Sequence, residues 1–401
     1  MRFLNDTWAP FSKGLLLSAS KISPTSGLMV VSKKADYQRK DTGGENLGAN
    51  CLLYKALSCG AEVATSIGGP SRIALAAKLT AQAKAVRAAI NALLWDARLG
   101  AFKDNTIPNN TLVPQDGNAL AVWFGVPNTT ARVASITQYL RGLWNEFGSV
   151  SPESSYGGIA TFPGSMEVFA HFQSGNSTRA HELIRRQWGY MLTSPHGTNS
   201  TPCWEGFNAD GTFGFGGAYM SHSHGWASGP AAALTFYTLG IRPASSVSRA
   251  VRARLGVSDG IDYVVAPQPG GLRWCRGSLS LGESENGKCG AGTGDVRVSW
   301  KQTRDAFALN VDPRGFADSK GALVVPLVRT FETSMQQKAC EVRVNGVTRW
   351  TLRGGLEAIV VRAGIPPLVV HGGDDGPSHA TINEVEASSL VEPLTVRVLF
   401  C

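Results

Sequence analysis

Apolar residues recur at helical spacing throughout the first half of the chain. The segment from Pro70 to Trp95 carries an apolar stripe formed by Leu75, Leu79, Val86, Ile90 and Leu93. Polar side chains lie on the opposite side, as expected for a helix that buries one face. Similar patterns predict helices over residues 5–20, 45–63, 129–147, 165–174, 176–192 and 230–239, and a further helix that ends near Gly125.

Loops separate these helices, and the longer loops recur at every second junction. Successive helical hairpins of this kind are typical of an α/α toroid, in which the loops at one end gather over a central pocket. A simple helical bundle is the alternative. The chain carries roughly half the helices of a complete six-hairpin toroid, so the pattern predicts a partial (α/α)6 toroid.

The period of the pattern changes from about residue 258 onward. Val296, Val298 and Trp300 alternate with polar residues, and Asn345-Gly346 is a favoured hairpin turn between two apolar runs. These signals predict an antiparallel β-sandwich. We therefore expect an α + β multidomain protein, with the toroid over residues 1–243 and the sandwich over residues 244–401, as the length of 401 residues also favours.

Composition excludes several classes of protein. Hydrophobic residues make up 43% of the chain and charged residues 17%, which indicates a globular protein rather than a disordered one. The net charge is +8, but the basic residues are spread along the chain, so binding to nucleic acid is not expected. No apolar run approaches the roughly 20 residues of a membrane span, so a membrane is not an expected partner either.

Five Asn-x-Ser/Thr sequons predict a secreted glycoprotein, at Asn5, Asn109, Asn128, Asn176 and Asn199. The first twenty residues lack the organisation of a signal peptide, so we expect that the natural N-terminus is a different one.

The chain has seven cysteines, and no two have the CxxC spacing of zinc or thioredoxin sites. Cys275 and Cys289 flank a polar segment and are expected to form a disulfide bond. Cys340 and Cys401 are a second candidate pair, and the odd count suggests a missing partner.

The stretch 199–230 collects most of the candidate chemistry. Glu205 follows Trp204 directly, and His222, His224 and Trp226 come after a glycine-rich segment. A carboxylate together with aromatic faces suits a carbohydrate, and a structural loop is the alternative. Two histidines at i and i+2 without a nearby third ligand make a weak metal site, so we expect neither a metal nor a cofactor.

Several of these segments resemble a known family. The segments TPCWEGFNADGTF, SHSHGWASGPAAALTFYTLGI, ADYQRKDTGGENLGAN and VPQDGNALAVWFGV resemble fungal α-L-rhamnosidases of glycoside hydrolase family 78. The helical segment GSMEVFAHFQSGNSTRAHELIRRQWGYM and the segment VVAPQPGGLRWCRGSLSLGE of the β half are similar too. The resemblance implies a six-hairpin catalytic barrel, a C-terminal β-sandwich, and inverting hydrolysis of terminal α-L-rhamnose from glycosides or polysaccharides.

The resemblance also implies roles for single residues. Glu205 matches the general base, with Trp204 beside it, and His224 matches a histidine that lines the sugar pocket. Asp36 matches an acid that helps to hold the sugar, although Tyr37 stands where the family usually has Trp.

From the residues themselves, Trp204 and Trp226 are expected either to stack on a sugar or to pack in the core. Glu167 is expected either to face the pocket or to cap its helix.

One part of the family's pattern is missing. Its general acid lies in an Arg-Asp-Glu segment that no stretch of this chain matches. Inversion needs an acid and a base about 6.5–9.5 Å apart. We therefore expect a truncated rhamnosidase that is inactive by itself. The alternatives are a non-catalytic carbohydrate-binding relative and another six-hairpin glycosidase or a polysaccharide lyase.

Overall fold

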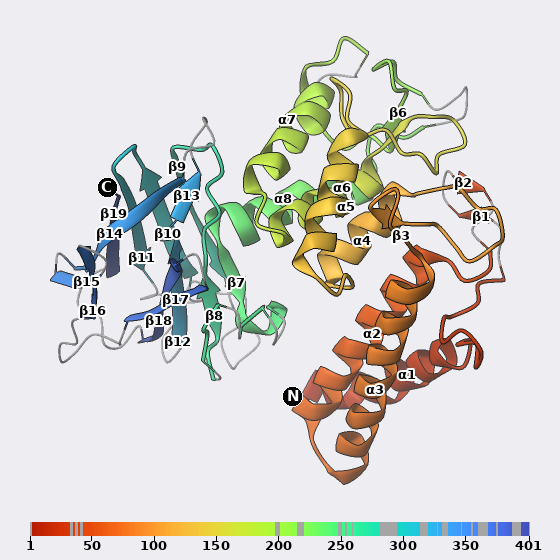
Figure 1. Ribbon diagram of the computed structural model, residues 1–401, viewed down its shortest axis with the longest axis horizontal. Helices are drawn as coiled ribbons and strands as arrows, with labels where there is room; N and C mark the ends of the chain where they lie inside the picture. Colours follow the sequence, from red (N-terminus) through yellow and green to blue (C-terminus); the bar gives the residue numbers. More distant parts are fainter. Residues whose placement is uncertain are drawn as a thin grey trace. The chain divides into compact units, whose positions relative to one another are not determined.

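A computed structural model gives the fold of the protein (Figure 1). It describes residues 2–32, 35–36, 39–40, 43–196, 201–214, 220–247, 251–252, 255–258, 260–280, 295–312, 320–326, 328–330, 336–345, 347–353, 356–359, 368–373, 376–386 and 394–400. The chain forms two compact units, Met1–Pro230 and Ala231–Cys401. The boundary predicted after residue 243 falls within the second unit.

The first unit is helical and repeats a two-helix hairpin. Its helices are α1 (Arg2–Ala19), α2 (Leu47–Ile67), α3 (Pro70–Leu93), α4 (Gln115–Phe124), α5 (Thr130–Gly142), α6 (Thr161–Gln173) and α7 (Ser177–Thr193). Helices α2, α4 and α6 pack against one another in sequence, and α3, α5 and α7 each pack on the helix before them. This alternation of inner and outer helices is the arrangement of an α/α toroid, so the predicted class of the helical half is confirmed.

Burial follows the same division. Most residues of α4 and α6 are buried, whereas α3 and α5 bury one stripe each. Gly117 of α4 allows close packing on α2, because a Cβ atom there would lie 2.7 Å from Leu47 Cδ2. A helix that is buried on most sides needs apolar side chains, or polar side chains whose hydrogen bonds are made within the protein. Helices α4 and α6 meet this requirement.

The predicted helix over 129–147 is shorter in the structure. Helix α5 ends at Gly142, and the side chain of Asn145 then accepts the backbone N–H groups of Phe147 and Gly148. Such an Asx turn offers the backbone an alternative to the helix. The apolar stripe therefore continues into a loop, which the periodicity alone did not indicate.

Among the described residues of this unit, very short strands form three pairs between the helices in sequence. They are β1 (Ala35–Asp36) with β2 (Arg39–Lys40), β3 (Trp95–Asp96) with β4 (Ala101–Phe102), and β5 (Ile159–Ala160) with β6 (Gly206–Phe207). The last pair brings the start of α6 next to the stretch that contains Glu205.

The described residues of the second unit form two β-sheets. The first has the order β16-β15-β14-β19-β11-β10-β9, with β13 paired to β14, and the second has the order β17-β18-β12-β8-β7. The strands of the first are β9 (Trp274–Ser280), β10 (Asp295–Gln302), β11 (Ala306–Asp312), β13 (Val328–Thr330), β14 (Gln336–Val344), β15 (Val347–Arg353), β16 (Leu356–Ile359) and β19 (Leu394–Phe400). Those of the second are β7 (Ile241–Pro243), β8 (Tyr263–Val265), β12 (Lys320–Pro326), β17 (Leu368–Gly373) and β18 (Gly376–Glu386).

One core joins the two sheets. Tyr263 and Leu323 of the second sheet share a buried cluster with Trp300 and Phe307 of the first. Two sheets that bury their facing sides in this way form a sandwich, as predicted. All strand pairs of the described residues are antiparallel except β12 with β8.

The predicted helix over 230–239 is irregular. Helix α8 (Gly229–Ala233) passes into a π-helix, η2 (Leu234–Leu239), which ends at Gly240 in the left-handed conformation. The Trp300 indole donates a hydrogen bond to the carbonyl of Thr238 and so attaches η2 to β10. The segment that departs from a regular α-helix, η2, is thus also the segment that contacts the sheet.

Other predictions have mixed outcomes. Asn109 and Asn128 are exposed, as expected for glycosylation sites, while Asn199 lies outside the described residues. Cys51, Cys59, Cys203 and Cys275 are free thiols. Cys289, the expected partner of Cys275, and Cys401 lie outside the described residues, and the side chain of Cys340 is not described either. Within the described ranges, no helix has the length and apolar character needed to cross a membrane.

Gly240 provides a test of how η2 is joined to the sheet. A Cβ atom at this position would lie 2.4 Å from the backbone nitrogen of Pro267, and φ is +93°. Gly240→Ala is expected to lower the free energy of unfolding of the second unit by about 2–4 kcal/mol, because the left-handed backbone and the overlap both cost energy. Denaturant unfolding measures this change.

The matched control is Gly271→Ala, since a Cβ atom there meets nothing within 4 Å. It is expected to change the stability by less than about 0.5 kcal/mol. Equal effects of the two substitutions would contradict the described contact.

Candidate active site

The backbone of Glu205 is held by two other segments. Its carbonyl oxygen accepts hydrogen bonds from Thr161 Oγ1 at 2.9 Å and from Trp226 Nε1 at 3.2 Å. Its N–H donates to the carbonyl of Ser221 at 2.8 Å. Glu205 is therefore fixed between the first residue of α6 and the segment 221–226 that follows in sequence.

The two oxygens of the Glu205 carboxylate differ in their surroundings. Oε2 accepts the backbone N–H of Ser221 at 3.1 Å and lies 3.6 Å from His224 Nδ1. Within the described residues, Oε1 makes no hydrogen bond. The Glu205 side chain is 20% exposed and that of His224 is 33% exposed, so solvent or a ligand can reach both. One oxygen is thus held by the protein and the other is available.

Trp226 forms the aromatic side of this site. Its ring stacks on Phe162 with centroids 5.2 Å apart and lies 4.0 Å from the His224 ring. Trp226 is half-buried, and its carbonyl accepts a hydrogen bond from Ser165 Oγ of α6. The structure therefore brings Glu205, His224 and Trp226 together, and their role in a sugar site stays a prediction.

Trp204 occupies a different environment. Its side chain is fully buried and makes edge contacts with Phe207, Phe213, Tyr190 and His222. The burial favours the alternative of core packing, because a buried ring offers no face to a sugar. Trp204 therefore packs in the core directly before Glu205 in the sequence.

The His222 ring stacks on the Phe213 ring, with centroids 3.6 Å apart.

Glu167 is fully buried in α6 rather than open to the site. Its carboxylate accepts hydrogen bonds from Gln115 Nε2 at 2.7 Å and Trp144 Nε1 at 2.5 Å, and it contacts His171 Nε2 at 3.2 Å. Neither expected role, a pocket-facing acid or a helix cap, describes this arrangement. The side chain instead connects α4, α6 and the loop after α5.

Asp36 lies in β1, opposite Arg39 of β2, and its side chain is outside the description. Arg39 is a residue that the sequence analysis did not single out. It is buried and pairs with Asp104 and, at 2.5 Å, with Asp116 of α4. Both residues lie in segments that carry the family resemblance: Arg39 follows Asp36 by three positions, and Asp116 is part of VPQDGN. These positions were the signal in the sequence that could have pointed to the pair.

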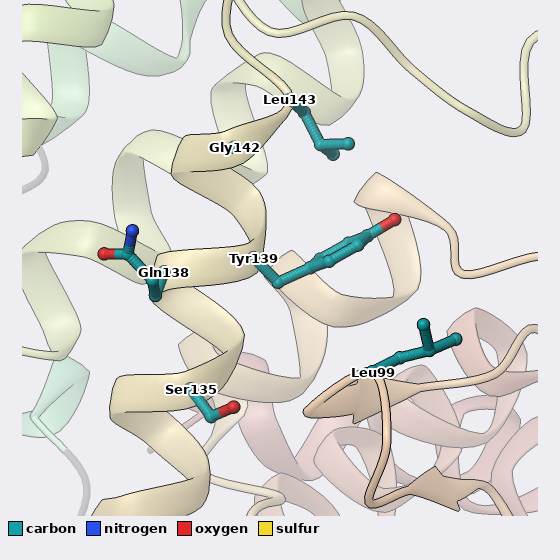
Figure 2. Close-up of a pocket in the computed structure, with 6 residues that line it drawn as sticks. All are labelled: Leu99, Ser135, Gln138, Tyr139, Gly142 and Leu143. Carbon is teal, nitrogen blue, oxygen red and sulfur yellow. The ribbon is translucent and has the colours of Figure 1, made fainter.

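A separate pocket of about 430 Å³ opens beside α5 (Figure 2). It is lined by Leu99, Ser135, Gln138, Tyr139, Gly142 and Leu143, and Figure 2 shows the Tyr139 ring extending between Leu99 and Leu143. None of the predicted site residues lines this pocket. Within the described part of the chain, no group of His, Cys, Asp and Glu is suited to hold a metal ion.

Solved structures that share the fold include three rhamnosidases. The match to a GH78 family rhamnosidase of Bacillus sp. GL1 covers 75% of this chain and 28% of that protein, with 22% identity and a TM-score of 0.56. The match to the α-L-rhamnosidase from Dictyoglumus thermophilum covers 99% of this chain and 37% of that protein, with 14% identity and a TM-score of 0.63. The match to the Streptomyces avermitilis α-L-rhamnosidase complexed with L-rhamnose covers 99% of this chain and 31% of that protein, with 15% identity and a TM-score of 0.59.

The chain thus spans 28–37% of the length of these three proteins. The sequence matches no protein-family model and none of the curated proteins. At these identities the likeness concerns the fold, a helical toroid followed by β-structure.

Thr161 provides a test of how Glu205 is held. Its buried hydroxyl donates to the carbonyls of Trp204 and Glu205, at 2.7 and 2.9 Å. Thr161→Val keeps the shape but removes the donor, and it is expected to cost about 1–3 kcal/mol of unfolding free energy because a buried carbonyl loses its partner.

Thr130→Val, at an exposed position at the start of α5, is the control and is expected to change the stability by less than about 0.5 kcal/mol. Denaturant midpoints compare the two variants. A Thr161→Val protein as stable as the wild type would show that these hydrogen bonds do not hold the segment.

Proposed function

We propose that Glu205 is the general base of an inverting α-L-rhamnosidase whose substrates are rhamnose-containing glycosides or polysaccharides. The observation that carries this proposal is the unequal setting of the two carboxylate oxygens, with Oε2 bound by Ser221 N–H and Oε1 without a hydrogen bond within the described residues. A base needs one oxygen that is free to take a proton and a carboxylate that is held in orientation. The resemblance of the CWEGF segment to family 78 supports the same role.

In this mechanism Oε1 takes a proton from a water molecule. The water oxygen attacks the anomeric carbon from the face opposite the leaving group, while the glycosidic C–O bond breaks. The leaving oxygen receives a proton from an acid on the other side of the sugar, and the configuration at the anomeric carbon inverts. The exposure of Glu205, 20% of its side chain, leaves room for this water.

His224 and Trp226 supply the sugar contacts in this proposal. His224 is 33% exposed and can hydrogen-bond a hydroxyl group, and the half-buried Trp226 offers apolar surface for a sugar face. Asp36, in the hairpin β1–β2, is proposed to hold another hydroxyl, as the resemblance implies.

The general acid is not assigned to this chain. Glu167, Asp104, Asp116 and Glu153 are buried and engaged by donors of the protein, which makes them poor acids for a sugar outside. Without a positioned acid to protonate the leaving group, the rate of hydrolysis falls by about 10²–10⁴-fold. We therefore propose that the chain alone does not hydrolyse rhamnosides.

The test measures turnover of an aryl α-L-rhamnoside by the purified protein and by a longer form to which an Arg-Asp-Glu segment of the family pattern is added. We expect no turnover from the first and turnover from the second, with a loss of at least about 10²-fold in Glu205→Gln. Glu146→Gln, at an exposed loop position, is the control and should keep full activity.

Each other outcome contradicts part of this account. Turnover by the chain alone that disappears in Glu205→Gln would show that an acid within this chain is sufficient. Full activity of Glu205→Gln in the longer form would remove the base assignment. Binding of L-rhamnose with no turnover in either form would favour a carbohydrate-binding protein, and turnover of a different glycoside would favour another six-hairpin glycosidase.

We also propose that the protein is secreted and N-glycosylated. The exposure of Asn109 and Asn128 supports this proposal, since a glycan requires an accessible side chain. Protein secreted from a eukaryotic host should become smaller on treatment with an endoglycosidase, and Asn109→Gln with Asn128→Gln should reduce that change. An unchanged mass after treatment would contradict glycosylation.

A further inference from the structure

An exposed tryptophan lies on the outer side of the first sheet of the β-sandwich. Side chains alternate between the two sides of a strand, and in β9 Cys275 and Leu279 pack against the core. Trp274 and Arg276, at the alternate positions, lie on the outer side and are exposed. Trp274 is 63% exposed, so its ring is open to solvent on a face that the core does not use.

Two basic side chains lie beside this ring. Lys301 of β10 is the direct partner of Trp274 in the register, and Arg276 follows Trp274 by two positions. Facing partners have Cβ atoms about 4.5–5.5 Å apart, and alternate positions of one strand lie roughly 6–7 Å apart. Lys301 and Arg276 are both exposed, and neither forms an ion pair with the described residues. An indole ring and two unpaired cations thus share one small area.

The other charged residues of β9, β10 and β11 do not extend this positive area. Arg297 lies opposite Asp312 in the register, and Asp295 is at the start of β10. The turn 303–305 contributes one charge of each sign, from Arg304 and Asp305. The excess of positive charge on these three strands is therefore confined to the surroundings of the exposed indole.

Protection of the sheet edge accounts for only part of this arrangement. Strand β9 is at the end of the described sheet, and a charged side chain such as that of Arg276 opposes pairing of an edge with another chain. Lys301 lies in β10, which has a partner strand on both sides. A single exposed apolar side chain is ordinary, but an indole does not protect an edge. A bound ligand accounts for Trp274, Arg276 and Lys301 together.

These three side chains suit a sugar that carries a carboxylate. An indole offers a large flat apolar surface on which the apolar face of a sugar ring can lie. Ammonium and guanidinium groups bind a carboxylate through charge-assisted hydrogen bonds. Ser299, which lies opposite Arg276 in the register, adds a hydroxyl group next to them. The face is also flat, because it is the side of a β-sheet, and so can accommodate a polymer that continues past the site.

The same observations disfavour two other partners. A protein interface normally has several apolar side chains at its centre, whereas the nearest neighbours of Trp274 on this face are charged. Single-stranded nucleic acid stacks successive bases on several aromatic rings along a basic groove. Here a single exposed ring is followed on the same face by the acidic residues Asp295 and Asp312.

We propose that the outer face of the β-sandwich at Trp274, Arg276 and Lys301 binds a polysaccharide that carries carboxylate groups, a polyuronate. The sugar ring lies on the indole, and the two basic side chains bind the carboxylate. This site is in the second unit, whereas the candidate active site is in the first, so the proposal stands whether or not Glu205 is a catalytic base.

The experiment measures binding of the full chain to polygalacturonate by isothermal titration calorimetry, with dextran as the neutral polymer. We expect saturable binding of polygalacturonate and at least about tenfold weaker binding of dextran, which has no carboxylate. Trp274→Ala should weaken the binding of polygalacturonate by about tenfold, because the stacking surface is lost. Lys301→Gln should weaken it by about two- to fivefold, as for an exposed ion pair.

Two control variants remove the same kinds of side chain from the helical unit. Phe3→Ala deletes an aromatic ring that is 75% exposed in α1, and Lys84→Gln deletes an exposed charge in α3. Both should bind polygalacturonate as the wild type does. Losses equal to those of Trp274→Ala and Lys301→Gln would overturn the proposal, because the binding would then follow total charge and apolar surface.

A measurement on the wild type decides the matter if Trp274→Ala does not fold. In ¹⁵N-labelled protein, the indole signal of Trp274 should shift during titration with oligogalacturonate, and that of the buried Trp300 should not. A shift of Trp226 alone would place the ligand at the candidate active site and overturn the proposal. It would also be overturned by no binding of polygalacturonate, by equal binding of dextran, or by equal binding of single-stranded DNA, which would indicate a general surface for polyanions.

Discussion

The carbonyl group of Glu205 is the point on which the candidate site depends. It accepts hydrogen bonds from a threonine hydroxyl at the start of α6 and from the indole of Trp226, which come from positions on either side of it in the sequence. Because a buried carbonyl without a partner is costly, these donors fix the peptide rather than merely touch it. The carboxylate can then be directed by Ser221 and His224 without a regular strand or helix around it.

The same principle explains how the helical layers are joined. Inner helices α4 and α6 carry Gln115, Asp116, Glu167 and His171 on buried surfaces, and these groups are satisfied mainly by one another and by loop residues. Hydrogen bonds in such places are strong because water is excluded, but each group depends on its neighbours. The loop after α5 belongs to the same network, because Ser154 bridges to Arg39 and residues 159–160 pair with residues 206–207.

The sequence was sufficient for features that depend on local period and turn chemistry. It predicted the helical half, the β half, and the grouping of Glu205 with His224 and Trp226. It was not sufficient where long-range packing decides. Arg39 and Asp116 are 77 positions apart, and no spacing rule connects them. The burial of Trp204 and Glu167 likewise depends on neighbours from other segments, and an Asx turn at Asn145 ended a helix whose apolar stripe continued.

The central claim is that Glu205, His224 and Trp226 form a sugar site, and the indole N–H of Trp226 reports on it directly because it donates to the Glu205 carbonyl. Titration of ¹⁵N-labelled protein with L-rhamnose, with D-glucose as a control, follows this resonance. The account predicts a saturable shift of the Trp226 signal with L-rhamnose, a much weaker one with D-glucose, and none for Trp300 in the β-sandwich core. An unchanged Trp226 signal, or the same shift with both sugars, would contradict the claim.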